Sequence, residues 1–70
     1  MPEMIFVDST SLEAVGYDGH SQELHVRFLT GAVYIYYEVP QHIVDAFMSA
    51  ASKGSFYNRE IRTVYRFSKQ

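Results

Sequence analysis

The segment Glu23–Leu29 alternates between polar and apolar side chains, and this pattern constrains the fold more than any other feature of the chain. A period of two is typical of a strand that buries only one of its faces. Turn sequences flank the segment, Asp18-Gly19 before it and Thr30-Gly31 after it. The segment is therefore predicted to be the middle strand of a three-stranded antiparallel meander, with neighbouring strands at Leu12–Tyr17 and Ala32–Glu38.

The second turn decides which tyrosines face the interior. A two-residue turn would hold the β-branched Thr30 at positive φ, a conformation that such residues resist. A type I turn over Leu29 and Thr30, followed by Gly31 in the left-handed region, avoids this strain and is favoured. In that register Tyr34 and Tyr36 lie on the face that a helix covers, whereas a slip of one residue would turn them to the other face. The favoured register makes three cross-strand pairs: Phe28 with Ala32, Val26 with Tyr34, and Leu24 with Tyr36.

Two helices are predicted after the sheet, which Val39-Pro40 ends. Proline in the first helical turn loses no hydrogen bond, and an apolar stripe at three- and four-residue spacing predicts a helix over Pro40–Ser52. Gly54 is expected to end that helix, and Ser55 to cap a short second helix that runs to Arg62.

The two terminal segments have the composition to extend the sheet. Met4–Val7 and Thr63–Phe67 are each predicted to form either a strand or an ordered arm. Because the strands precede the helices, the chain is predicted to be one α+β domain over residues 1–70. Its parts are a three-stranded antiparallel meander, one main helix, a short second helix and an extra edge strand from the N- or C-terminal segment.

The residue types argue against several functional classes. The chain has no cysteine, which removes disulfides, thiolate metal sites and thiol nucleophiles. The three histidines lack the spacing of a two-ligand metal site on one element, and the sequence has no phosphate-cradling glycine loop or nucleophile elbow. We therefore predict no catalytic residues, no metal and no cofactor. No apolar stretch could span a bilayer and the N-terminus has no basic signal region, so a cytoplasmic protein is expected.

A series of motifs follows in a fixed order along the chain. It comprises Leu12-Glu-Ala-Val-Gly-Tyr17, Leu24-x-Val-x-Phe28, Gly31-x-x-Tyr34-Ile35-Tyr36, Val39-Pro40 and Ser52-Lys-Gly-Ser-Phe-Tyr-Asn58-x-x-Ile61-Arg62, with Tyr65 close behind. Over residues 9–67 the series resembles the KTSC domain, which occurs at the C-terminus of some lysyl-tRNA synthetases and as a stand-alone bacterial protein. The Tyr-x-Tyr signature of that family corresponds to Tyr34 and Tyr36, which we interpret as structural. The resemblance implies RNA, and structured RNA such as tRNA in particular, as a candidate partner.

Charge is distributed unevenly along this chain, which is acidic overall. Residues 1–52 contain one base and seven acids, whereas residues 53–70 contain five bases and one acid. Such asymmetry can create a positive patch suited to phosphate. We therefore predict an RNA-binding surface with six contributors: Arg27, Tyr37, Arg59, Arg62, Tyr65 and Arg66. Three of the arginines would share one helix face if the second helix continued to residue 66.

Two alternatives to an RNA-binding surface stay open. The basic residues can simply form a solvated surface that neutralises the acidic remainder of the chain. The sheet face without a helix, which carries Val33, Ile35 and Tyr37, can instead pair with a second copy or another protein if Met4–Val7 leaves it exposed. The sequence thus predicts a non-enzymatic interaction module, with RNA binding as the leading hypothesis and homodimerisation or protein binding as the alternative.

Overall fold

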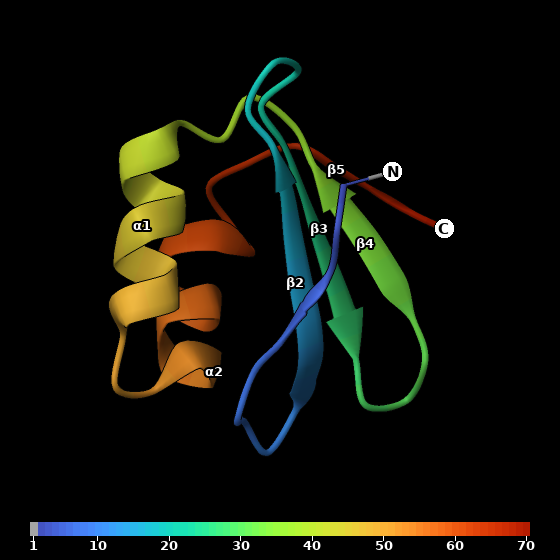
Figure 1. The fold of residues 1–70 in the computed structure, drawn as a ribbon, viewed down its shortest axis with the longest axis vertical. Helices are drawn as coiled ribbons and strands as arrows, with labels where there is room; N and C mark the ends of the chain where they lie inside the picture. The colour runs from blue at the N-terminus through green and yellow to red at the C-terminus, as the bar shows by residue number, and fades with distance from the viewer. Residues whose placement is uncertain (1) are drawn as a thin grey trace.

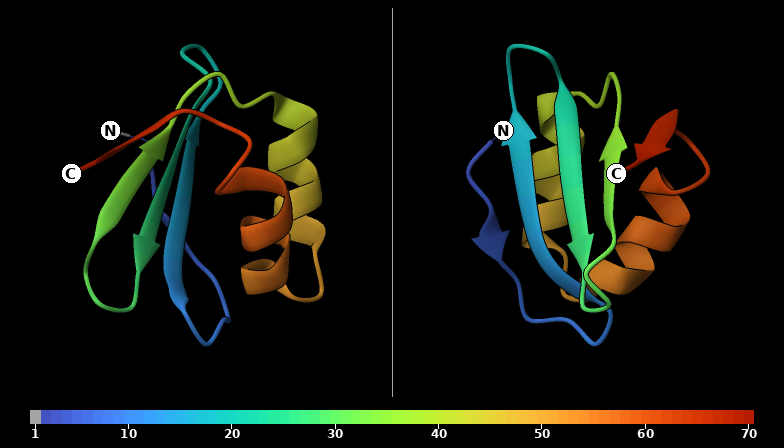
Figure 2. Two further views of the ribbon diagram at one scale, coloured as in Figure 1. Left: turned by 180° about the vertical axis from the view of Figure 1, so that it is seen from behind. Right: turned by 90° about the vertical axis from the view of Figure 1, so that its right-hand side faces the viewer.

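The computed structural model describes residues 2–70. Five strands form one antiparallel sheet in chain order: β1 (Ile5–Phe6), β2 (Leu12–Asp18), β3 (Glu23–Phe28), β4 (Val33–Tyr36) and β5 (Phe67–Lys69). The helices cover one face of this sheet, and both termini lie on the side away from them (Figure 1; Figure 2). The predicted α+β meander is therefore the centre of a larger sheet, because both terminal segments add an edge strand.

The turn between β3 and β4 has the predicted geometry. Gly31 takes φ +94°, the left-handed conformation that only glycine adopts without strain. The Phe28 N–H donates to the Ala32 carbonyl and the Gly31 N–H to the Phe28 carbonyl, each at 2.9 Å. The strands pair Leu24 with Tyr36 and Val26 with Tyr34. The predicted register is thus confirmed, and the side chains of the Tyr-x-Tyr motif lie on the helix-covered face.

The helical region follows different boundaries from those predicted. It consists of α1 (Gln41–Ser49), the short α2 (Lys53–Phe56) and the π-helical turn η1 (Tyr57–Ile61). Ala50 takes extended backbone and ends α1 early, and Ser52 then caps α2 by accepting from the Ser55 N–H at 3.4 Å. The predictions of a stop at Gly54 and a cap at Ser55 are wrong, because Ser52 stands one residue before the helix and its hydroxyl satisfies a free N–H there.

The core lies between the helices and the covered face of the sheet. Val44 and Phe47 of α1 and Tyr57 and Ile61 of η1 are buried in it. The strands supply the other side through Leu12, Val15, Leu24, Val26 and Tyr36. No helix in the described part of the chain is long and apolar enough to cross a membrane.

The N-terminal segment crosses the face of the sheet that the helices leave open. A β-carbon added at Gly16 would sit 2.7 Å from the Met4 Sδ and 2.9 Å from the Glu3 carbonyl oxygen. Only glycine therefore lets residues 2–4 approach the sheet this closely. Gly16 pairs with His25 of β3, whose side chain is buried.

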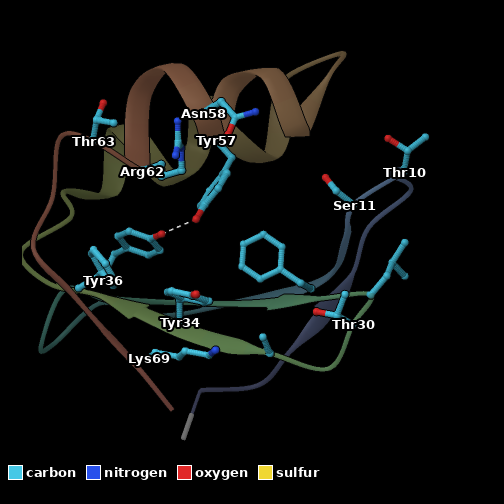
Figure 3. A pocket seen from close by; sticks show the side chains of 14 residues that line it. Thr10, Ser11, Thr30, Tyr34, Tyr36, Tyr57, Asn58, Arg62, Thr63 and Lys69 are labelled. Atoms are coloured by element: carbon cyan, nitrogen blue, oxygen red, sulfur yellow. Dashed lines mark hydrogen bonds between the residues drawn. The ribbon is translucent and has the colours of Figure 1, made fainter.

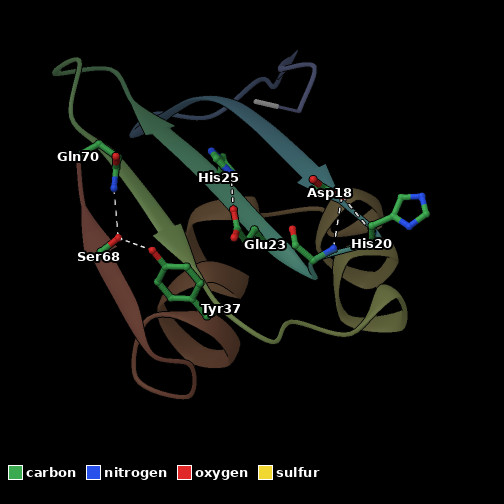
Figure 4. A network of polar contacts seen from close by, with 8 residues as sticks. Asp18, His20, Glu23, His25, Tyr37, Ser68 and Gln70 are labelled. Carbon is green, nitrogen blue, oxygen red and sulfur yellow. Dashed lines mark hydrogen bonds and ion pairs between the residues drawn. The ribbon is translucent and has the colours of Figure 1, made fainter.

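Polar contacts hold several side chains on this open face (Figure 4). The His25 Nε2 lies 3.4 Å from a carboxylate oxygen of Glu23. The Tyr37 and Ser68 hydroxyls form a hydrogen bond of 2.7 Å, and the Gln70 amide donates to Ser68 at 3.1 Å. These last contacts fasten β5 to the segment that follows β4.

Candidate functional site

A groove of about 840 Å³ runs between η1 and the part of the sheet formed by β3, β4 and β5 (Figure 3). Five aromatic side chains line it: Phe28, Tyr34, Tyr36, Tyr57 and Phe67. Alternation along the strands puts them there. The pairing of β4 with β5 sets Phe67 opposite Tyr36 and Lys69 opposite Tyr34, all on the helix side of the sheet. The groove is therefore built from segments that are far apart in the sequence.

The aromatic rings pack against one another and leave part of their area facing the groove. Phe28 meets Tyr34 and Tyr57 edge to face, with ring centroids 5.5 and 5.4 Å apart. Tyr34 and Phe67 lie tilted with their centroids 5.5 Å apart. Tyr34 is half-buried, and 50% of Phe67 is exposed. These two rings are thus held in place by neighbours and still offer surface to a ligand.

Two buried hydroxyls meet on the inner wall of the groove. The phenols of Tyr36 and Tyr57 are hydrogen-bonded to each other (Figure 3). Only 1% of Tyr36 and 7% of Tyr57 are exposed. Burial raises the pKa of both phenols above the ordinary value for tyrosine, and the hydrogen bond between them raises the pKa of Tyr36 further. Both groups are therefore neutral hydroxyls at physiological pH.

The π-helical turn η1 places Arg62 on the same wall of the groove as the two phenols. The Arg62 N–H donates to the Tyr57 carbonyl at 2.9 Å, which is a bond between residues five apart. An α-helical turn would have set Arg62 above Asn58, because its hydrogen bonds join residues four apart. The wider turn aligns Arg62 with Tyr57 instead, and both side chains line the groove.

The groove carries positive charge that no described residue neutralises. Three arginines form ion pairs elsewhere: Arg27 with Glu13 at 2.6 Å, Arg59 with Glu60 at 3.1 Å, and Arg66 with Glu38 at 3.7 Å. The Lys53 ammonium donates to the Ala50 carbonyl at 3.1 Å. Arg62 and Lys69 make no ion pair with another residue in the range 2–70, and both line the groove. None of the lining residues is an aspartate or a glutamate.

The predicted RNA-binding residues lie at separate places on the molecule. Arg62 lines the groove, whereas Arg27 is on the open face with its guanidinium 5.8 Å from the ring centroid of Phe6. Arg59 lies over the Phe56 ring at 5.9 Å. The helix ends at Ile61 and a turn follows, so the condition for one shared arginine face is not met.

The remaining predicted residues also lie outside the groove. The Arg66 guanidinium lies 5.5 Å from the ring centroid of Tyr37, the residue that follows β4. Tyr65 is half-buried and packs against the core. The two motif residues that were interpreted as structural both line the groove, and Tyr36 is also buried in the core.

Sequence reasoning missed Lys69 as a member of the site. Its ammonium lies 6.0 Å from the ring centroid of Tyr34. The alternation of Phe67 and Lys69 around Ser68 carried the signal, because residues two apart in a strand share one face. The predicted strand ended at Phe67 and so did not reach Lys69, whereas β5 occupies Phe67–Lys69.

A polar hollow of about 400 Å³ continues the groove. The two share Thr10, Ser11 and Asn58. Hydroxyl groups dominate the hollow, which also includes Ser9, Ser52 and Ser55. A ligand longer than one ring could therefore extend from the aromatic groove along a surface of hydrogen-bonding side chains. Within residues 2–70, no cluster of three or more histidine or acidic side chains could hold a metal ion.

Comparison with known proteins places the fold in a family. A family model described as the KTSC domain matches residues 8–65. A protein of Tsukamurella paurometabola is 43% identical over 60 residues, which make up 86% of this chain and 90% of that protein. The crystal structure of a KTSC domain protein from Yersinia pestis is 30% identical, with a TM-score of 0.96 over 100% of this chain and 99% of that one.

A more distant relative bears on the synthetase context that the sequence resemblance implied. A lysine–tRNA ligase of Nostoc punctiforme is 27% identical over 62 residues, which are 89% of this chain and 11% of that protein. This match does not confirm a synthetase-type domain. The family model, the Tsukamurella relative and the Yersinia structure together cover nearly the whole sequence, and the chain therefore belongs to the KTSC domain family.

Proposed function

We propose that the domain is a non-enzymatic module that binds single-stranded segments of RNA in the aromatic groove. One observation carries the proposal. Arg62 and Lys69, the two lysine or arginine side chains with no ion pair or hydrogen bond among the described residues, both line a groove walled by aromatic rings and free of acids. Cations beside exposed ring faces are the combination with which proteins bind unpaired nucleotides.

Base stacking explains why the partner would be single-stranded. Tyr34 and Phe67 offer ring surface to the groove, and an unpaired base can stack on such a surface. In a duplex the faces of the bases are already occupied by their neighbours. Arg62 and Lys69 would then contact the phosphates on either side of the stacked base.

Two observations support RNA over DNA as the partner. Hydroxyl and amide side chains at the rim, among them Thr10, Ser11 and Asn58, can exchange hydrogen bonds with a 2′-hydroxyl. The relative from Nostoc punctiforme is named a lysine–tRNA ligase, so one protein with a similar segment bears the name of an RNA substrate. A tRNA with unpaired nucleotides is therefore the structured RNA to test beside short oligomers.

Replacing Tyr34 with alanine is expected to weaken binding of a pentaadenylate RNA by about 5- to 150-fold, the range that loss of one stacked base represents. Tyr34→Phe should bind within about two-fold of the native domain, because stacking uses the ring and not the hydroxyl. Fluorescence anisotropy with a labelled oligomer at low salt measures both.

A second variant separates stacking from folding. Phe67 is half exposed, so Phe67→Ala removes a stacking surface with little loss of core packing. We expect weaker RNA binding and a nearly unchanged melting temperature. Native affinity in both Tyr34→Ala and Phe67→Ala would contradict the proposal.

The second candidate function is self-association through the open sheet face. Phe6 lies on that face, 72% exposed, and Val33 and Ile35 are half-buried there. These side chains would pack against their counterparts in a second copy. Light scattering at increasing protein concentration decides the matter, since the mass of a single chain at all concentrations would exclude this candidate.

A further inference from the structure

We infer that the inner wall of the groove holds a terminal phosphate of the bound RNA, between the Arg62 guanidinium and the hydroxyl pair of Tyr36 and Tyr57. The inference rests on the proposed RNA binding and adds which chemical group the groove selects. It predicts a preference for RNA ends that carry a phosphomonoester.

Counting protons shows that the tyrosine pair has a hydrogen bond to give. Two phenols carry two hydroxyl protons, and the bond between them uses one. The second proton meets no acceptor among the described residues, since neither hydroxyl forms a further hydrogen bond there. A polar side chain this deeply buried normally has its hydrogen bonds satisfied. The pair is therefore ready to donate to an acceptor that a ligand brings.

The surroundings of the pair favour an anionic acceptor. The positive charge of Arg62 acts on both phenols, where it opposes the rise in pKa that burial causes. Arg62 has no acidic partner within residues 2–70, and no acid lines the groove. An oxyanion beside Arg62 could accept from the guanidinium and from the free hydroxyl proton together. Charge-assisted hydrogen bonds of this kind are the strong ones, and arginine suits phosphate in particular.

The burial of the tyrosine pair favours a terminal phosphate of the RNA over a phosphate inside the RNA chain. Because Tyr36 and Tyr57 are almost wholly buried, only a group that projects from the ligand can reach their hydroxyls. A phosphate within the strand carries a sugar on each side and one negative charge. A terminal phosphomonoester projects on a single ester bond and carries a charge of about −1.5 to −2 at neutral pH. A terminal phosphomonoester can therefore reach the buried hydroxyls, and its negative charge complements the positive charge of Arg62.

The test compares pentaadenylate RNA with and without a 5′-phosphate on the native domain and on two hydroxyl-deletion variants. We expect the phosphorylated oligomer to bind about ten-fold more tightly to the native domain. The double variant Tyr36→Phe/Tyr57→Phe should reduce that preference to about two-fold, because both rings stay and no hydroxyl proton remains to donate to the phosphate, whereas a single substitution would leave one free proton. Tyr17→Phe is the matched control, since the Tyr17 hydroxyl donates to the Val39 carbonyl outside the groove, and it should keep the full preference.

The outcomes separate this inference from the function on which it rests. Equal binding of the two oligomers to the native domain, still dependent on Tyr34, would overturn the phosphate site and leave RNA binding in place. A preference that survives in the double variant Tyr36→Phe/Tyr57→Phe would overturn the role of the hydroxyl pair. Absence of binding by either oligomer at low salt would remove the RNA proposal and this inference with it. Melting curves of each variant confirm that the fold is intact.

Discussion

Replacing Phe47 with alanine is expected to lower the free energy of unfolding by about 3–5 kcal/mol. The Phe47 side chain is 0% exposed and stacks on Phe56 with ring centroids 5.6 Å apart, so the substitution leaves a cavity where α1 meets α2. A 70-residue domain has a total stability of about 4–10 kcal/mol. The variant should therefore lose much of its folded population, and thermal unfolding followed by circular dichroism should show a midpoint at least about 12 °C lower.

Phe6→Ala is the matched control for this experiment. It deletes the same atoms from a side chain that is 72% exposed, whose one notable contact is the guanidinium of Arg27. Its cost should stay below about 1 kcal/mol. Equal shifts in the two variants would mean that Phe47 does not occupy the core position described above.

The double variant Arg62→Glu/Lys69→Glu is expected to weaken binding of pentaadenylate RNA at least about a hundred-fold at low salt. Each substitution removes a charge-assisted contact to phosphate and sets a repulsive carboxylate in its place. Both positions line the groove and neither forms an ion pair with another described residue, so folding should be little affected. The native domain, with two phosphate contacts, should lose about seven-fold in affinity between roughly 50 and 200 mM salt.

Arg59→Glu/Arg66→Glu provides a control of equal net charge. These arginines lie outside the groove and pair with Glu60 and Glu38. The control changes the overall field of the protein by the same amount but leaves the groove intact, so its binding should fall by less than about three-fold. If both double variants lose affinity equally, RNA binding results from general electrostatic attraction to the basic residues of segment 53–70 and not from contacts in the groove.

The central sheet was predictable because local rules decide it. Alternation in β3 sets which residues are buried, and Gly31 restricts the turn to one register, which places Tyr34 and Tyr36 correctly. Local pattern does not decide the terminal strands, because two or three residues are too few to show a period. β1 and β5 form because a ready-made sheet edge pairs with them.

The groove could not be predicted, because its walls come from three distant segments. The Tyr-x-Tyr motif, the helix end and the C-terminal strand meet only in the folded chain. An α-helical period would have placed Arg62 with Arg59 and Arg66, whereas the π-helical turn aligns it with Tyr57. Arg59 and Arg66 form ion pairs with Glu60 and Glu38, whereas Arg62 forms none with a described residue. Sequence spacing alone does not reveal this difference.

The measurement that tests the central claim most directly is an NMR titration of the isotopically labelled domain with pentaadenylate RNA and with bulk tRNA, each at low and near-physiological salt. Side-chain signals are essential, because Tyr34 and Ile35 are neighbours in β4 whose side chains point to opposite faces. We expect salt-sensitive shifts in the rings of Tyr34 and Phe67 and at the Arg62 guanidinium, with no shift of the Val33 and Ile35 methyl groups. Shifts confined to those methyl groups, or no shifts at low salt, would contradict the central claim.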